Sequence, residues 1–199
     1  MKGRLYSLTV FLGIVFLKIF SRLQVKGKKS IPESGSFILV SNHVSLLDPL
    51  ILGAVSHRKL NSMAKEELFS NFLSSFWMRN IKAFPVKRKS HDVGAIREAL
   101  RRIKSGEPLL MFPEGGRSAN GEILDAQPGA GMLAAHTGVP ILPVFIKGSR
   151  EVLTRGSSFI RPKKIIVYFG KPFYISRDQD RQETAKRIKN EIVSLGRSA

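Results

Sequence analysis

A histidine and an aspartate, His43 and Asp48, lie five positions apart in this chain of 199 residues. A neutral imidazole can take a proton from an alcohol and return it to a leaving group, and a carboxylate on its other ring nitrogen would fix the tautomer. On one helix the two side chains would point roughly 140° apart, so they can meet only where the chain turns. The apolar run 37–40 before them and Pro49 after them predict a strand, a loop and a helix start. We therefore expect a His-Asp pair on a strand-to-helix connection.

Asp48 also has a structural interpretation. Asp before Pro is a common helix start, with the carboxylate as N-cap and the proline in the first helical position. The capping role does not exclude the catalytic one, so both interpretations of Asp48 stay open.

A second group of polar residues follows the apolar run 109–112, in the sequence Pro-Glu-Gly-Gly-Arg-Ser. Glu114 could accept hydrogen bonds from substrate hydroxyls, and Arg117 could bind a phosphate with two parallel hydrogen bonds. The glycines between them allow the backbone to approach a ligand closely. The structural alternative is a glycine turn that carries solvated charges.

Two further blocks follow, and the second of them, residues 138–144, contains no group able to do proton chemistry. Residues 84–89 end in three adjacent cations, which could form an anion site, although such basic runs are more often merely solvated. Residues 138–144 combine prolines with branched side chains and are typical of a rigid, apolar strand entry. We expect this last block to contribute shape. The other histidines, His57, His91 and His136, lack a carboxylate at comparable spacing.

The composition limits the class of protein. A net charge of +18 implies an anionic partner, which could be a nucleic acid, a membrane surface or a phosphorylated substrate. The absence of cysteine excludes disulfides, thiolate metal sites and a cysteine nucleophile, and it fits a reducing compartment. Nucleic acid is disfavoured because aromatic residues do not alternate with cations on one face.

The first 32 residues carry seven Lys and Arg, no acidic residue and the apolar run 5–20. As a helix this run would span about 24 Å, which is less than the roughly 30 Å of a hydrocarbon core. A cleaved signal peptide or a buried core helix would also fit the pattern. We favour a helix embedded in one leaflet, with basic residues on anionic headgroups.

The rest of the chain alternates between strand and helix patterns. Apolar runs predict strands at 37–40, 109–112, 141–146 and 165–169, with a possible edge strand at 83–86 that contains Pro85. Helices are expected to begin at Pro49 and near Lys65, Asp92, Pro128 and Asp180. These patterns predict an α/β domain at 33–199, with a mixed, mostly parallel sheet flanked by helices, after a membrane-anchoring segment at 1–32.

In two predicted helices the spacing of the apolar residues indicates which residues share one face. The helix after Asp92 repeats apolar residues at Val93, Ile96, Leu100 and Ile103, which indicates an amphipathic helix. The aromatic residues within 69–77 also follow a helical spacing. We expect this second helix in the core, and otherwise beside an acyl-chain groove or against lipid.

The four blocks, in this order and at these separations, resemble the glycerolipid acyltransferase family, most closely the 1-acylglycerol-3-phosphate acyltransferases. The first family motif corresponds to Asn42, His43 and Asp48, and the second ends in Arg88. The third corresponds to 112–118 and the fourth to 139–144. Single motifs of this kind are weak, whereas four collinear ones are highly specific.

The chain departs from the family pattern at two positions. Gly116 stands where the third motif usually has threonine, and Lys82 stands where the second often has glycine. The likeness covers residues from about Gly35 to Val144 and is looser beyond them.

The resemblance implies acyl transfer from a thioester, either acyl-CoA or acyl carrier protein, to the free 2-hydroxyl of lysophosphatidic acid. His43 would be the general base and Asp48 its orienting partner, with no metal or cofactor. The implied substrate-binding residues are Lys87, Arg88, Glu114, Gly115, Arg117, Ser118 and Pro143. The alternative is a sibling enzyme that acts on glycerol-3-phosphate, another lysophospholipid or an aminoacyl lipid.

A covalent acyl-enzyme is disfavoured, since no serine sits in a nucleophile-elbow pattern and Ser45 lies only two residues from His43. The expected partners also include anionic membrane lipids, and the expected location is peripheral, on the cytoplasmic face of the cell membrane.

Overall fold

The computed structural model describes Tyr6, Gly13, Val15 and residues 21–87, 92–157 and 159–197. Its strands are β1 (Gln24–Lys26), β2 (Ile38–Ser41), β3 (Asn61–Lys65), β4 (Ala83–Val86), β5 (Leu109–Met111), β6 (Ile141–Lys147) and β7 (Ile166–Phe169). Its α-helices are α2 (Asp48–Val55), α3 (Phe72–Asn80), α4 (Val93–Lys104), α5 (Gly129–Thr137), α6 (Ser149–Val152) and α7 (Arg181–Arg197). Two short 3-10 helices are η1 (Lys28–Ser30) and η2 (Glu66–Phe69).

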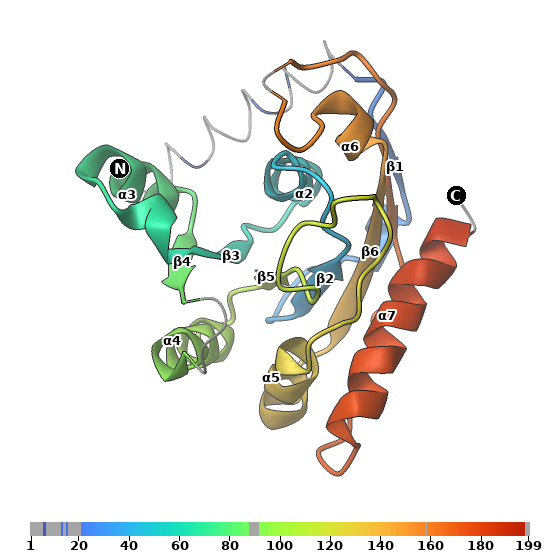
Figure 1. Ribbon diagram of the computed structural model, residues 1–199. Coiled ribbons are helices and arrows are strands. Elements are labelled where there is room, and N and C mark those ends of the chain that lie inside the picture. The colour runs from blue at the N-terminus through green and yellow to red at the C-terminus, as the bar shows by residue number, and fades with distance from the viewer. Residues whose placement is uncertain are drawn as a thin grey trace.

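The strands form one sheet in the order β1-β7-β6-β2-β5-β3-β4 (Figure 1). All pairings are parallel except that of β6 with β7, which is antiparallel. The predicted mixed, mostly parallel sheet is therefore confirmed. Because β2, β3, β4, β5 and β6 run the same way, the loops that follow them gather at one edge of the sheet, where ligands of open α/β sheets bind.

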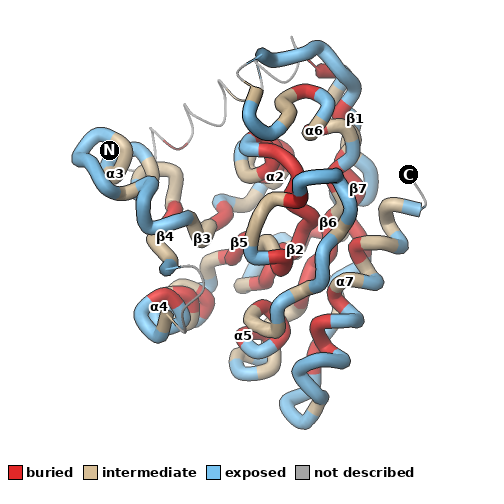
Figure 2. The backbone as a smooth tube through the Cα atoms, in the orientation of Figure 1, coloured by how far each residue is buried: buried red, intermediate tan, exposed pale blue. Residues whose placement is uncertain are grey.

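Side chains of the central strand β2 are buried on both faces of the sheet. Leu39 joins a core with Ile51 of α2 and Val152 of α6, whereas Ile38 and Val40 join a core with α4, α5 and α7. Figure 2 shows this burial along the central strands. Full burial of each such side chain stabilises the fold by about 1.5–3 kcal/mol, so both layers hold β2 and its following loop in place.

Four predicted strands and the predicted edge strand are present, and β4 with Pro85 lies at the end of the sheet. The sequence patterns missed β1 and β3. Residues 24–26 pair with β7, and Ile31 is buried in the core. The domain that the sequence placed at 33–199 thus includes these earlier residues as well.

The predicted membrane-anchoring segment lies mostly outside the described residues. Of the apolar run 5–20, the structure describes Tyr6, Gly13 and Val15, all three helical. Tyr6 is buried, and its hydroxyl accepts the Leu60 backbone N–H at 3.3 Å. Among the residues described, none of the helices combines the length and the apolar character needed to cross a bilayer.

One prediction about helix faces is wrong, and another holds only in part, since Ile103 and Leu100 of the predicted apolar stripe in α4 contact the core. No residue of α3 is buried, so the aromatic helix expected in the core lies on the surface (Figure 2). In α4 the buried residues are Ala95, Ala99 and Ile103, while Val93 and Ile96 are exposed. The small alanines face the sheet because they let the helix approach it closely.

Candidate active site

The two residues that the sequence analysis singled out meet within hydrogen-bond reach. His43 follows β2, and its Nδ1 lies 2.9 Å from Oδ2 of Asp48, the first residue of α2. Both side chains are buried, the aspartate completely. An ionised carboxylate only accepts hydrogen bonds, so Nδ1 carries the proton and Nε2 is left as the basic nitrogen. This is the arrangement that a general base requires.

Asp48 also organises the loop in front of it. Its Oδ2 accepts the backbone N–H groups of Val44 at 2.7 Å and Ser45 at 2.8 Å. Its Oδ1 accepts the hydroxyl of Ser149 at 2.6 Å. The predicted capping role is wrong in this form: Leu47 occupies the N-cap position of α2, and no side chain caps that end. The carboxylate instead points back into the loop and fixes it around the histidine.

A stacked aromatic ring also contacts one face of the imidazole. The ring of His43 stacks on Phe112, with centroids 4.0 Å apart and an interplanar angle of 18°. Phe112 directly follows β5, the neighbour of β2 in the sheet. The stacking and the bond to Asp48 together restrict ring rotation, so Nε2 keeps one direction.

Glu114 bonds to main-chain groups on both sides. Its Oε1 accepts the backbone N–H of His43 at 2.8 Å, and its Oε2 accepts that of Leu124 at 3.0 Å. Burial raises the pKa of the Glu114 carboxyl, and these two N–H donors oppose the rise. Glu114 therefore ties the loop after β5 to the histidine, a role that the sequence did not predict; contact with substrate hydroxyls remains a prediction.

The rest of the third motif forms a tight turn against the histidine loop. Ser118 is buried, and its backbone N–H donates to the carbonyl of His43 at 2.8 Å. Gly115 has a φ of 69°, a conformation that other residues rarely adopt. The structure thus brings Glu114 and Ser118 to His43, with Gly115 in the turn between them.

The Asn42 side chain links the end of β2 to β6 through two hydrogen bonds. Its amide nitrogen donates to the carbonyl of Ile146 at 3.0 Å, and its carbonyl oxygen accepts the Ile146 N–H at 2.8 Å. This pair extends the contact of β2 with β6 beyond the end of the β2 ladder. The first residue of the motif therefore sets where the histidine loop leaves the sheet.

Ser149 is a site residue that the sequence analysis missed. It follows β6 and Gly148, whose φ is 90° and where a Cβ would lie 2.0 Å from the carbonyl oxygen of Lys164. Only glycine fits there, and the turn it makes carries Ser149 to Asp48. A Gly-Ser pair two residues after the predicted strand 141–146 is the one signal that could have indicated it.

The predicted cations lie in less buried surroundings. Arg117 is partly exposed, and its side chain forms no ion pair with any residue that the structure describes. Lys87 is exposed just beyond β4 at the same edge of the sheet, with its Nζ 3.9 Å from Oε1 of Glu66. Arg88 lies outside the described residues. Pro143 is buried within β6, in register with Val40 of β2.

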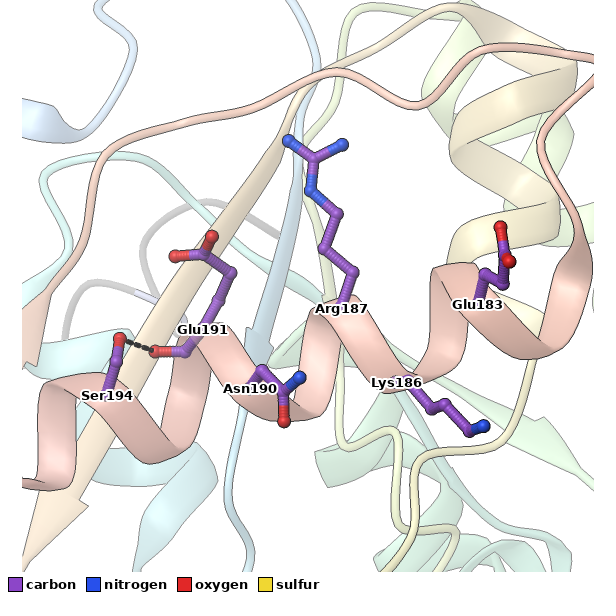
Figure 3. A pocket seen from close by; sticks show the side chains of 6 residues that line it. All are labelled: Glu183, Lys186, Arg187, Asn190, Glu191 and Ser194. Atoms are coloured by element: carbon purple, nitrogen blue, oxygen red, sulfur yellow. Dashed lines mark hydrogen bonds between the residues drawn. The ribbon is translucent and has the colours of Figure 1, made fainter.

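A small, mainly apolar pocket lies beside the start of α2. It is lined by Tyr6, Pro49, Leu50, Gly53, Leu60, Ser62, Ile81 and Leu110. Two of its lining residues, Pro49 and Leu50, directly follow Asp48 in the chain. A second, shallow hollow lies along the outer face of α7 (Figure 3). It mixes charges of both signs on one helix and contains no residue of the His-Asp site.

The described residues also include no cluster of three or more His, Asp or Glu side chains that could hold a metal ion.

The fold and the site define an α/β protein with a buried His-Asp pair at the carboxyl edge of its sheet. The chain belongs to the acyltransferase family, whose model matches residues 22–147. It is 30% identical to a 1-acyl-sn-glycerol-3-phosphate acyltransferase of Streptococcus pneumoniae, over 94% of this chain and 72% of that protein. It is 26% identical to the Bacillus subtilis protein of the same name, over 80% and 78% of the two chains.

A solved structure is also similar. The crystal structure of the 1-acyl-sn-glycerophosphate (LPA) acyltransferase PlsC from Thermotoga maritima matches with a TM-score of 0.79 and 28% sequence identity. The match covers 96% of this chain and 78% of that one.

Proposed function

We propose that this protein transfers an acyl chain from an acyl thioester to the free 2-hydroxyl of lysophosphatidic acid, which yields phosphatidic acid. The observation that carries the proposal is the buried pair of His43 and Asp48 at 2.9 Å, on a chain of the acyltransferase family. The names of the similar proteins from S. pneumoniae and B. subtilis support lysophosphatidic acid as the acceptor.

In the proposed reaction His43 Nε2 takes the proton of the acceptor hydroxyl as its oxygen attacks the thioester carbonyl carbon. Asp48 stabilises the imidazolium that forms. The tetrahedral intermediate then collapses, the carbon–sulfur bond breaks, and the imidazolium returns the proton to the departing thiolate. The products are an ester and a free thiol, so no cofactor or metal is needed.

Attack is proposed to be direct, without an acyl-enzyme. The chain has no cysteine. The two serines nearest to the histidine in sequence, Ser41 and Ser45, are engaged elsewhere, because the Ser41 hydroxyl donates to Oδ1 of Asn42 at 3.4 Å and the Ser45 hydroxyl donates to the Leu153 carbonyl at 3.0 Å. A hydroxyl held in such a bond is not activated by His43.

The remaining groups have proposed binding roles. Arg117, with Lys87 and Arg88, would hold the acceptor phosphate, which suits a guanidinium that pairs with no carboxylate in the described part of the chain. Glu114, Gly115, Ser118 and Pro143 would shape the acceptor site. The apolar pocket beside Pro49 would take the start of an acyl chain. The net charge of +18 favours work on an anionic membrane surface, which we place at the cytoplasmic face.

The test is a transfer assay with purified protein that crosses two donors, acyl-CoA and acyl carrier protein, with several acceptors. The acceptors are lysophosphatidic acid, glycerol-3-phosphate, a zwitterionic lysophospholipid and an aminoacyl lipid, and His43→Ala serves as the blank. We expect the highest kcat/KM with lysophosphatidic acid. A higher value with another acceptor would identify a sibling activity and overturn the assignment.

A further inference from the structure

Helix α3 presents large apolar side chains to solvent. Phe72 is 86% exposed and Leu73 is 75% exposed, and Phe76 and Trp77 on the next turn are exposed as well. The rings of Phe72 and Phe76 stack at 6.4 Å between centroids, so the side chains form one continuous surface. Leu68 of η2 adds a further exposed apolar group. Soluble proteins rarely expose such a cluster unless it meets a partner.

The chain order places the start of α3 at the active-site edge. The helix follows β3 and η2, and β3 runs parallel to β5, which in turn runs parallel to β2. The loops after these three strands therefore share one edge, and His43 lies in one of them. In Figure 1 α3 projects from this side of the sheet, away from α5 and α7.

The charge near α3 favours an anionic partner. Residues 59–89 contain seven Lys and Arg against two acidic residues, Glu66 and Glu67. The two acidic side chains lie beside cations, since Glu67 pairs with Lys65 at 2.7 Å and Glu66 lies 3.9 Å from Lys87. Exposed aromatic side chains within a basic region are typical of surfaces that enter the headgroup layer of a bilayer.

We infer that Phe72, Leu73, Phe76 and Trp77 form a lipid-docking surface, which inserts into an anionic bilayer and brings the active-site edge to the membrane. The choice of a bilayer as the occupant rests on the proposed function, because a lipid acceptor must reach the same edge. Insertion would bury the apolar side chains, while Arg79 and Lys65 remain at the level of the headgroups.

The chain carries its own probe for this docking, since Trp77 is its single tryptophan. The full-length protein is mixed with vesicles of phosphatidylcholine and phosphatidylglycerol, without substrates. We expect a blue shift of the emission, quenching by brominated acyl chains, and weaker binding at high salt. Binding to vesicles with neither shift nor quenching would mean that another surface docks, and would overturn the inference.

Variants test the same surface. The double substitution Phe72→Gln with Leu73→Gln removes two exposed side chains, so we expect the partition coefficient to fall about tenfold or more. Tyr174→Gln is the matched control. It changes another exposed aromatic, which follows Phe173, the partner of Ile141 at the opposite edge of the sheet. Equal binding by the double variant and the control would contradict the lipid-docking surface.

A separate assay keeps this inference distinct from the proposed function. Transfer to a short-chain, water-soluble lysophosphatidic acid without vesicles should be equal in the parent and the double variant. If the parent itself fails to transfer, the proposed function fails, whereas the fluorescence result still decides whether α3 docks.

A second, independent observation concerns Ser149. Its side chain is fully buried, and it donates to Oδ1 of Asp48 from 101 positions further along the chain. The opposite oxygen of Asp48 accepts the loop N–H groups and faces His43. With donors on both oxygens the carboxylate cannot rotate without the loss of a hydrogen bond.

Given the proposed function, we infer that Ser149 is a positioning residue that keeps Asp48 aligned on His43. Ser149→Ala should lower kcat about tenfold with KM unchanged, in line with the loss of one hydrogen bond to a charged group. Thr184→Val removes an equally buried hydroxyl in α7 and should leave kcat unchanged.

The Ser149→Ala assay is run well below the unfolding temperature of each variant. Without the hydrogen bond from Ser149, Oδ2 of Asp48 carries more negative charge. The acidic limb of the kcat/KM profile should therefore move to higher pH. A purely structural defect would not move this limb. Parent-like kcat and an unmoved limb in a folded Ser149→Ala variant would overturn this inference. Ser149→Cys, which keeps a weak donor, should give an intermediate kcat.

Discussion

The two halves of the candidate site differ in burial and in bonding. The histidine loop is buried, and Asp48 accepts four hydrogen bonds within it. The predicted phosphate-binding cations are more exposed, and Arg117 forms no ion pair with the described part of the chain. Proton transfer depends on atom positions within a hydrogen-bond length, so it needs a rigid setting. A phosphate can be met by long side chains that adjust to it.

The largest effect should follow the loss of the base. His43→Ala should lower kcat/KM by about 10³-fold or more, because general acid-base catalysis contributes up to about 10⁴-fold. The measurement is thioester-dependent transfer, with circular dichroism to confirm the fold. Near-normal activity of the folded variant would exclude His43 as the base.

Removal of Asp48 should damage the structure as well as the activity. Asp48→Ala leaves the buried N–H groups of Val44 and Ser45 without their acceptor, at a cost of about 1–3 kcal/mol each. We expect a large fall in kcat together with a lower urea midpoint. Unchanged stability would show that the histidine loop does not depend on this carboxylate. The buried and the exposed half of the site would then not differ in their contribution to stability.

A substitution in the exposed half of the site should change the affinity for substrate and leave the stability of the protein unchanged. Arg117→Ala should raise KM for lysophosphatidic acid about 10- to 100-fold, as expected for a lost hydrogen bond to a charged group, with the unfolding midpoint unchanged. Monoacylglycerol, which lacks the phosphate, should show no such change in KM. Arg177→Ala serves as the control for an exposed arginine remote from the site. Parent-like KM would remove Arg117 from the phosphate site.

The smallest effect should be the pH dependence that Glu114 contributes. Burial raises the pKa of this carboxyl above its ordinary value of 4.5. Its contribution to stability is therefore complete below pH 4.5 and is lost as the pH rises through the folded pKa. The stability advantage of the parent over Glu114→Gln should thus be larger at pH 4 than at pH 8. Urea unfolding of both proteins at each pH measures this, and a larger advantage at pH 8 would contradict the raised pKa.

The sequence patterns predicted the regular parts of this fold well. Apolar runs of β-forming residues identified β2, β5, β6 and β7, and Pro85 correctly placed its strand at an edge. Strands β1 and β3 were missed because both are largely polar, and their extended form depends on pairing with β7 and with β4 and β5. Hydrophobic periodicity does not register a strand that is stabilised by its neighbours.

The helix faces show where periodicity alone is insufficient. In α4 the larger apolar residues Val93 and Ile96 are exposed, and the alanines face the core. In α3 the aromatic spacing favoured a core helix, whereas no residue of this helix is buried. The position of each helix on the sheet decides which side chains are covered, and that position depends on contacts far away in the chain.

By itself the sequence determined the residue types, the turn between His43 and Asp48, and the alternation of strands and helices, because these depend on neighbours a few positions apart. The tertiary structure alone decided that Asn42 bonds to Ile146 of β6, that Ser149 of α6 bonds to Asp48, that Glu114 binds the backbone of His43, and that α3 is exposed. Those contacts join residues 71 to 104 positions apart or depend on what covers a surface. They form only when the sheet brings β2, β5 and β6 side by side.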